Sequence, residues 1–365
     1  MKKVLLMNQQ GVPYETSPAR YQLVHELKRK GYETYVFNQG KILHDENWKD
    51  IDHFINTANM SKRQIRKKII GIMPQYIIAT TDDDIKILFP LLPVMEMFLI
   101  YYNLEIYTPE REQRRNGNKS SLWYPLLWRT AYLWNKTQEV IFIKKCRFFT
   151  IQDSLRRRIS KKYFIYHPDT LLIPNSYVYN ERDRVKNESC GVVYSGALVR
   201  FRMEPLMRKL HGLPDFPIVF SGKCDAWFRN QFKILHAAHP AMKLKEQSLP
   251  PKKHLEFIKQ YAVGLVWYDH SKDENEENIG MASGKLFRHI SVGQPVIVSA
   301  TPGLAKIVCK YKLGIVINDI SELTDAYREI MADYSQYQDN IRHVYKSKFD
   351  YNQNIKPFLE KMEEM

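Results

Sequence analysis

A lysine behind a loop of small and polar residues gives this sequence a candidate anion site. The loop spans residues 278–284, and its candidate ligand-binding residues are Asn278, Gly280 and Ser283. Lys285 follows at the start of a predicted short helix that Gly293 ends. Backbone N–H groups and a lysine at a helix N-terminus stabilise a bound anion. An ordinary helix–strand unit without a ligand fits the same pattern, and both interpretations stay open.

Three adjacent carboxylates form the second candidate site. Asp82, Asp83 and Asp84 follow the apolar residues 76–80, which predict a short strand. Residues at the carboxyl ends of strands gather at the active sites of open sheets, so Asp82 or Asp83 could act as a general base or hold a metal. Aspartates also cap helices, which is their commoner role in a first turn. The sequence leaves the two roles open.

The composition is that of a folded globular protein with room for two domains. The chain has 365 residues, of which 44% are hydrophobic and 26% are charged. Its four cysteines form no CxxC pair, which suits a reducing compartment and predicts neither a disulfide framework nor a metal site. The apolar residues 4–7 are too few for a signal-peptide core, and prolines and Glu96 interrupt the apolar run 87–102. We therefore expect a cytoplasmic protein.

Positive charge is concentrated in the first half of the chain. Residues 1–189 carry 31 Lys and Arg against 20 Asp and Glu, out of 55 and 40 in the whole chain. An excess of this kind suits nucleic acid, an anionic membrane surface or an anionic substrate. No nucleic-acid recognition motif accompanies it, so we expect no nucleic acid partner.

An aromatic segment with basic flanks covers residues 121–149. It contains Trp123, Trp128 and Trp134 among leucines, with Lys144 and Lys145 near its end. A helix of this composition can lie in the interface of an anionic membrane. It can equally be a core helix with large side chains, and the sequence does not decide between the two.

The order of predicted elements indicates an α/β protein with doubly wound sheets. A strand at 3–7, a loop containing Gly11, a helix at 19–30 and a strand at 33–37 form a βαβ opening. Residues 177–189 are the candidate linker, after which strands are predicted at 191–196, 216–220, 263–267, 296–298 and 315–317. The charged helices from Ser321 onward have no obvious partner in their own domain. The absence of GxGxxG argues against a nicotinamide or flavin dinucleotide.

Four local motifs carry a resemblance to a known family. They are Phe149–Ser154 with Leu172–Ser176, Tyr194–Leu198, Val219–Gly222 and Lys285–Ile297. The last resembles the Lys-Leu-Phe-Glu-Tyr-Met-Ala-Ala-Gly-Lys-Pro-Val-Ile pattern of glycosyltransferase family four. The whole chain resembles that family and its bacterial polysaccharide-assembly relatives.

The resemblance implies the GT-B architecture, in which two Rossmann-like domains face a central cleft. It predicts an acceptor-binding domain at 1–180, a nucleotide-sugar-binding domain at 190–345 and a C-terminal helix at 346–365 that packs back on the first domain. The implied enzyme is a metal-independent, hexosyltransferase-like glycosyltransferase without a cofactor. It would move a sugar from a nucleotide diphosphate donor, with a UDP-sugar expected, to a hydroxyl of a glycan or polyprenyl-linked acceptor in surface polysaccharide assembly. We expect it in the cytoplasm, peripheral on the inner face of the membrane.

The resemblance also suggests roles for individual residues. Candidate donor-binding residues are Gly11, Gly196, Arg200, Arg202, Gly222, Asn278, Gly280, Ser283 and Lys285, and Asp82 or Asp83 is the candidate base. One departure stands out: Arg288 and Gly280 occupy the positions of the family's two motif glutamates, although Glu274, Glu276 and Glu277 lie just upstream. A catalytically silent relative that binds a nucleotide sugar or a partner protein is therefore the alternative.

Overall fold

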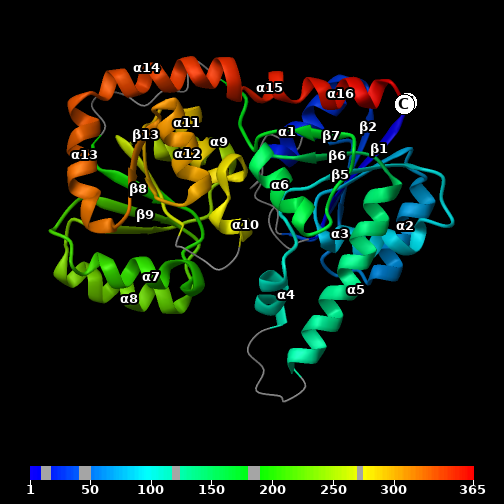
Figure 1. The fold of residues 1–365 in the computed structure, drawn as a ribbon, viewed down its shortest axis with the longest axis horizontal. Coiled ribbons are helices and arrows are strands. Elements are labelled where there is room, and N and C mark those ends of the chain that lie inside the picture. The colour runs from blue at the N-terminus through cyan, green and yellow to red at the C-terminus, as the bar shows by residue number, and fades with distance from the viewer. Residues whose placement is uncertain (10–17, 41–50, 117–123, 180–189, 269–273) are drawn as a thin grey trace. The chain divides into compact units, whose positions relative to one another are not determined.

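A computed structural model describes the chain except residues 10–17, 41–50, 117–123, 180–189 and 269–273. It forms two compact units, each of which is shown in Figure 1. Unit 1 comprises Met1–Pro174, Lys272–Asn275 and Ile355–Met365. Unit 2 comprises Asn175–Ser271 and Glu276–Asn354.

Unit 1 is built on a parallel sheet with the strand order β3-β2-β1-β4-β5-β6-β7. Its strands are β1 (Lys3–Asn8), β2 (Glu33–Asn38), β3 (His53–Asn56), β4 (Tyr76–Ala79), β5 (Phe98–Tyr102), β6 (Cys146–Ile151) and β7 (Thr170–Leu172). Its longer helices are α1 (Pro18–Arg29), α2 (Lys62–Ile72), α3 (Asp82–Leu88), α4 (Pro109–Asn116), α5 (Tyr124–Lys145), α6 (Ser154–Lys162) and α16 (Lys356–Glu363). The inner strands are apolar runs buried on both faces, as a parallel sheet covered by helices requires.

The two faces of the unit 1 sheet are covered by different helices. One core contains Ile69 of α2, Leu88 of α3 and Phe142 of α5. On the other face, Phe358 of α16 packs against Tyr102 and Phe148, with ring centroids 5.7 and 5.1 Å apart. The last eleven residues of the chain therefore belong to the core of unit 1.

Unit 2 repeats the same winding in a parallel sheet of order β10-β9-β8-β11-β12-β13. Its strands are β8 (Val192–Ser195), β9 (Ile218–Gly222), β10 (Lys243–Glu246), β11 (Val263–Val266), β12 (Val296–Ser299) and β13 (Gly314–Ile317). Its main helices are α7 (Arg200–Leu210), α8 (Ala226–Ala238), α9 (Pro251–Ile258), α11 (Gly284–Ser291), α12 (Pro302–Tyr311), α13 (Leu323–Ala332) and α14 (Tyr334–Val344). Short helices α10 (Glu274–Glu277), η4 (Gly280–Ala282) and α15 (Tyr351–Asn354) complete the elements used below.

Alternate residues of the unit 2 strands build two cores. Tyr194 and Phe220 face a core shared with α7, α8 and α13, whereas Val193 and Val219 face α9 and the end of α11. Figure 1 shows α7 and α8 on one side of this sheet and α11 and α12 on the other. The period of two in a strand produces this division.

The structure corrects the prediction about the C-terminal helices and describes part of the predicted linker. Leu323 and Ile330 of α13 are fully buried in the core of unit 2, so α13 does have a partner in its own unit, whereas α16 packs in unit 1. Of the predicted linker 177–189, residues 180–189 lie outside the described residues. Tyr177 is buried, and its N–H donates to the Tyr345 hydroxyl (2.8 Å) within unit 2. Among the helices that the structure describes, none combines the length and the apolar character needed to cross a membrane.

Candidate functional site

Two glycines allow the ends of β8 and β9 to approach closely. A Cβ atom on Gly222 would lie 1.7 Å from the backbone oxygen of Gly196, and a Cβ on Gly196 would lie 2.9 Å from Cε of Lys285. The Gly196 N–H donates to Ser221 O (2.9 Å), which holds the two strand ends together. No side chain fits at Gly222, because the clash is with backbone, whereas a side chain at Gly196 would displace the end of the Lys285 side chain. The two glycines leave the Lys285 side chain room beside the carboxyl edge of the sheet.

Lys285 is a buried cation held by aromatic side chains. Its side chain lies 9% exposed in the first turn of α11, and its Nζ donates to the Tyr194 hydroxyl (2.7 Å). Nζ also lies 4.6 and 4.4 Å from the ring centroids of Tyr194 and Tyr268. No carboxylate among the described residues forms an ion pair with it. Burial lowers the pKa of Lys285 well below its usual value, and the nearby positive charges of Arg202 and Arg288 lower it further.

The N-terminus of α11 is capped next to this lysine. The Ser283 hydroxyl accepts a hydrogen bond from Leu286 N (3.2 Å), and it lies 3.2 Å from the Tyr268 hydroxyl. Gly293 has φ +71°, in agreement with its predicted role at the end of this helix. The predicted short helix with Lys285 in its first turn, its end at Gly293 and the strand after it are confirmed, whereas residues 280–282 of the predicted loop form a 3-10 helix and α12, which begins at Pro302, was not predicted.

Two arginines and one glutamate add to the charge around Lys285. Arg288 is half-buried and donates from Nε to the Tyr177 hydroxyl (3.3 Å), while Arg202 is exposed in the first turn of α7. Glu276 partly offsets these cations, since its charge raises the pKa of Lys285. Tyr194, Gly196, Arg202, Tyr268, Ser283, Lys285 and Arg288 are called the Lys285 cluster below. An anion bound there would relieve the mutual repulsion of the three cations.

A serine–histidine contact lies at the same end of β8. Ser195, the last residue of β8, contacts Nε2 of His254 from α9 through its hydroxyl. Burial lowers the pKa of His254 well below its usual value, and the charges of Arg288 and His289 lower it further. His254 is thus held neutral, which leaves it able to exchange a hydrogen bond with Ser195 at ordinary pH.

The other predicted residues of this domain lie in different surroundings. Arg200 extends into solvent, where its Nε donates to Glu204 (3.0 Å) and its guanidinium lies over Trp227. Asn278 and Gly280 pack by their backbones against Gly303 of α12, and Gly280 adopts φ +37°. The structure thus brings Gly196, Gly222, Arg202, Ser283 and Lys285 together, and it gives Arg200 a surface ion pair instead.

In unit 1, the third aspartate of the acidic run is the one that caps α3. Asp84 is fully buried, and its carboxylate accepts hydrogen bonds from Thr80 N (2.7 Å), Thr81 N (3.0 Å) and Gln9 N (2.9 Å). Burial raises the pKa of Asp84 to about 6, against the opposing effect of the hydrogen bonds from Thr80. The capping role considered for this run is therefore filled by Asp84.

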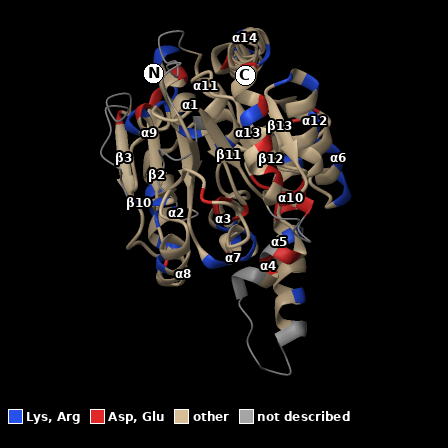
Figure 2. Ribbon diagram, turned by 90° about the vertical axis from the view of Figure 1, so that its left-hand side faces the viewer, with Lys and Arg blue, Asp and Glu red and all other residues tan. Residues whose placement is uncertain are grey.

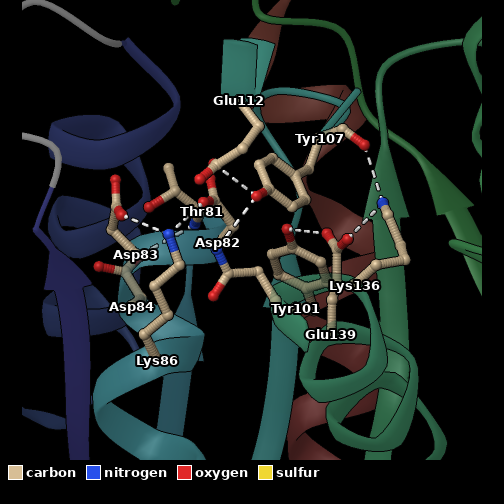
Figure 3. Close-up of polar contacts among 11 residues, drawn as sticks. Thr81, Asp82, Asp83, Asp84, Lys86, Tyr101, Tyr107, Glu112, Lys136 and Glu139 are labelled. Carbon is tan, nitrogen blue, oxygen red and sulfur yellow. Dashed lines mark hydrogen bonds and ion pairs between the residues drawn. The ribbon is translucent and has the colours of Figure 1, made fainter. Parts of the chain in front are cut away.

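Asp82 and Asp83 share a lysine. Lys86 Nζ donates to Asp82 Oδ2 (3.1 Å) and Asp83 Oδ1 (3.2 Å), as Figure 3 shows. The Asp82 side chain is 4% exposed and that of Asp83 is 29% exposed. Both carboxylates lie at the carboxyl end of β4, and the Asp82 side chain is the more buried of the two.

A buried polar network lies next to Asp82. The Tyr107 hydroxyl donates to Glu112 Oε2 (2.6 Å), the Tyr101 hydroxyl donates to Glu139 Oε1 (2.9 Å), and Lys136 Nζ pairs with Glu139 Oε2 (2.7 Å) (Figure 3). Burial raises the pKa of the Glu139 carboxyl; Lys136 opposes this rise and Asp82 adds to it. The sequence pattern had not singled out these tyrosines and glutamates, because they come from separate elements.

Some predictions remain without structural description. Gly11 lies outside the described residues, so its predicted role stays a prediction. In the described part of the chain, His, Cys, Asp and Glu side chains nowhere gather in a group of three or more suited to a metal ion. Tyr194, Tyr268, Ser195 and His254 joined the site only in three dimensions. Tyr194 and Ser195 lie in one of the four motifs and Tyr268 follows a predicted strand, but no pattern in the sequence pointed to His254.

Comparison with known families matches part of the second half of the chain. Residues 235–348 match the family model for the C-terminal domain of glucosyltransferase 3-like proteins. This range includes α11 and Lys285 but stops short of β8 and β9. No curated protein matches the chain significantly by sequence.

Comparison with solved structures covers nearly the whole chain. HepE from Anabaena, in complex with UDP and glucose, superimposes with a TM-score of 0.70 at 13% identity and covers 100% of both chains. Sucrose-phosphate synthase from Thermosynechococcus elongatus gives 0.69 at 13% identity, covering 100% of this chain and 99% of that one. WaaG, a glycosyltransferase involved in lipopolysaccharide biosynthesis, gives 0.68 at 13% identity, covering 97% and 98%. The chain therefore has the GT-B fold of these glycosyltransferases, as the four motifs predicted.

Proposed function

We propose that the chain is a glycosyltransferase that moves a sugar from a nucleotide diphosphate sugar to a hydroxyl of a glycan or lipid-linked acceptor. The observation that carries the proposal is Lys285, a buried lysine at a helix N-terminus with no described carboxylate partner. A buried unpaired cation is costly, and proteins keep such groups where a ligand completes them. The diphosphate of the donor is the expected ligand.

The Lys285 cluster supplies what a leaving diphosphate requires. Negative charge develops on the diphosphate as the glycosidic bond to the donor breaks, and cations positioned in advance stabilise it. Lys285, Arg202 and the N–H groups at the start of α11 would carry that charge, so that a bound metal would not be needed. An incoming diphosphate would raise the depressed pKa of Lys285 and keep it protonated.

Asp82 is the proposed base of unit 1. It is ionically paired with Lys86 and almost wholly enclosed, so its carboxylate has a fixed orientation. A carboxylate in this state can accept the proton of an acceptor hydroxyl as that hydroxyl attacks the sugar. Asp83 is the second candidate, more exposed and bound to the same lysine.

A UDP-sugar is the proposed donor. HepE was solved with UDP-glucose and WaaG is involved in lipopolysaccharide biosynthesis, and both share the fold of this chain. These comparisons favour a role in surface polysaccharide assembly. Such a role would place the enzyme on the cytoplasmic side of a membrane.

The first experiment is a thermal-shift panel of nucleotides and nucleotide sugars. A ligand that binds only the folded protein raises its unfolding temperature, so a response to UDP and UDP-sugars above other nucleotides supports the donor site. Lys285→Met should remove the response, because it keeps the side-chain volume and removes the charge. Lys310→Met, at an exposed position of α12, is the matched control and should keep it. An unchanged response in Lys285→Met would reject the site.

A catalytically silent relative is the second candidate, and Arg288 favours it. An arginine stands where the resembled family has the glutamate that binds the donor ribose, so this chain could bind a nucleotide sugar without transferring it. A transfer assay with the donor from the panel separates the two. Binding without transfer or donor hydrolysis, over a range of acceptors, would favour the silent relative.

A further inference from the structure

The outward face of α5 carries exposed apolar side chains in a regular row. Leu127, Trp134 and Ile141 recur every seven residues, which places them on one side of the helix. Their exposed fractions are 61%, 63% and 39%, and Leu133 beside them is 62% exposed. Single exposed apolar residues are ordinary, but a continuous row of them marks an interaction surface. These four residues are called the α5 stripe.

The inward face of the same helix carries charge. Lys136 and Glu139 are buried, pair with each other at 2.7 Å and hydrogen-bond to Tyr107 O and Tyr101. The inward face of α5 thus combines a buried ion pair with core residues such as Phe142, and exposed apolar side chains remain on the outward face, where an ordinary surface helix is polar. This buried network fixes which side of the helix faces outward, so that the stripe cannot turn inward without breaking it.

Two threonines beside the stripe direct their hydroxyl protons into the helix and not outward. The Thr130 hydroxyl donates to Leu127 O (2.9 Å) and the Thr137 hydroxyl donates to Leu133 O (2.9 Å), both within the helix. The hydroxyl protons of both threonines are thus used within the helix.

Charge on and beside the helix indicates the chemistry of the partner. Arg129, Lys144 and Lys145 are exposed on α5, and Arg147 follows at once on β6. The one acidic residue in the α5 sequence, Glu139, is buried and paired. Figure 2 marks Lys and Arg positions on α5 in blue, and Figure 1 shows this helix running past the edge of the unit 1 sheet.

We propose that the α5 stripe lies in the interface of an anionic lipid bilayer, with its tryptophan and leucines among the acyl chains and its cations at the headgroups. An exposed tryptophan flanked by aliphatic and basic side chains has the composition of interfacial helices. Each nearby Lys or Arg adds attraction to anionic lipid. The proposal concerns this surface alone and does not rest on the proposed glycosyl transfer.

Co-sedimentation with vesicles tests the surface. The full chain should bind vesicles of equal parts phosphatidylglycerol and phosphatidylcholine, and binding should weaken with salt and in pure phosphatidylcholine. Leu127→Ser with Trp134→Ser should lower the partition coefficient at least about tenfold, because two apolar anchors are lost. Ile234→Ser, at a 59% exposed position of α8 in unit 2, is the matched control and should bind like the parent chain.

Trp134 itself provides a second measurement. The fluorescence of Trp134 is the part of the signal that the Trp134→Phe variant lacks. Brominated lipids should quench this part if Trp134 inserts among the acyl chains. Purely electrostatic adsorption to the headgroups would leave it unquenched. Trp134→Phe serves this test even if the double variant fails to fold. Three outcomes would overturn the proposal: no vesicle binding by the parent chain at low salt, equal binding by parent and stripe variant, or absence of quenching. A stripe variant that loses a dimer without affecting vesicles would show that a second copy covers this face, which also contradicts it.

Discussion

The two sheets of this molecule share a winding order and differ in the charge at the same edge. In unit 1, β1 lies between β2 and β4, and in unit 2, β8 lies between β9 and β11. These are the points where the order of strands reverses and where open α/β sheets bind ligands. Unit 1 places carboxylates there, from the start of α3, whereas unit 2 places Lys285 there, from the start of α11.

The difference shows that winding fixes the position of a site and side chains fix its chemistry. Each aspartate of α3 has a partner in unit 1: Lys86 contacts Asp82 and Asp83, and backbone N–H groups donate to Asp84. Lys285 forms no ion pair with a described carboxylate, and Glu276 offsets its charge only in part. Under the proposed function, the acidic edge of unit 1 handles a neutral hydroxyl and its proton, and the basic edge of unit 2 handles an anion.

The largest expected effect comes from Asp82→Asn. If Asp82 is the base, the transfer rate should fall about 10² to 10⁴-fold, which is the usual contribution of a positioned general base. Affinity for the donor should stay the same, because the substitution lies in unit 1. Asp83→Asn is the matched control and should reduce the rate far less. Steady-state transfer assays with donor titrations measure both, and equal losses in the two variants would contradict the choice of Asp82.

Gly222→Ala should destabilise the fold of unit 2. Its Cβ would overlap the backbone oxygen of Gly196, and no side-chain movement relieves a clash between backbones. We expect a loss of roughly 3 kcal/mol or more in stability, together with the loss of UDP binding.

Gly71→Ala in α2 is the control, since nothing lies within 4 Å of its Cβ position. It should stabilise the protein by about 0.5–1 kcal/mol, as alanine does in a helix. Unfolding temperatures measure both, and an undamaged Gly222→Ala would mean that the two strand ends can separate freely.

Lys285→Met should separate binding from stability. Donor affinity should fall roughly 30-fold, in keeping with the loss of a charged hydrogen-bond donor, while the free protein becomes more stable because a buried unpaired charge is gone. The pKa of Lys285 is lowered by folding, so below that folded value the cost of burying its charge is fully present. As pH rises from the folded pKa toward the ordinary lysine value, the native state has lost its proton and the unfolded state has not, so stability rises.

The predicted rise of stability with pH can be measured. The stability advantage of Lys285→Met over the parent chain should shrink as pH rises through that window, and denaturant unfolding at several pH values follows it. UDP binding by the parent chain should also take up protons at alkaline pH, which calorimetry in buffers of different ionisation enthalpy detects. Proton uptake that persists in Lys285→Met would assign the effect to another group.

The sequence predicted most inner strands of both sheets and the helix that carries Lys285, but it did not predict the inner strand β5, whose apolar run was considered only as a membrane span. Strands such as β1, β9 and β12 are apolar runs that only a buried parallel strand explains. It did not predict β3 or β10, because edge strands are half-exposed and β10 reads Lys-Leu-Lys-Glu. The N-terminal position of Lys285 and the cap at Gly293 followed from local rules.

What the sequence could not give was the set of contacts between distant elements. Tyr194 and Tyr268 meet Lys285 through tertiary structure alone, and only coordinates show that Asp84 caps while Lys86 holds Asp82. The aromatic helix was ambiguous for a similar reason. Its apolar residues lie nearly all around it, so the buried Lys136–Glu139 pair decides which face is inside.

The smallest expected effects separate two neighbouring arginines of α7. Arg202 influences Lys285 electrostatically and has no described carboxylate partner, whereas Arg200 is already paired with Glu204. Arg202→Gln should weaken UDP binding about three- to tenfold, a modest loss because the side chain is exposed and solvent screens its charge. Arg200→Gln should change affinity less than twofold, since the ion pair that it breaks lies on the surface. From the sequence, both arginines were candidate ligands of the donor diphosphate. Calorimetric titration of the two variants with UDP tests the distinction that the structure draws, and a larger loss in Arg200→Gln would reverse it.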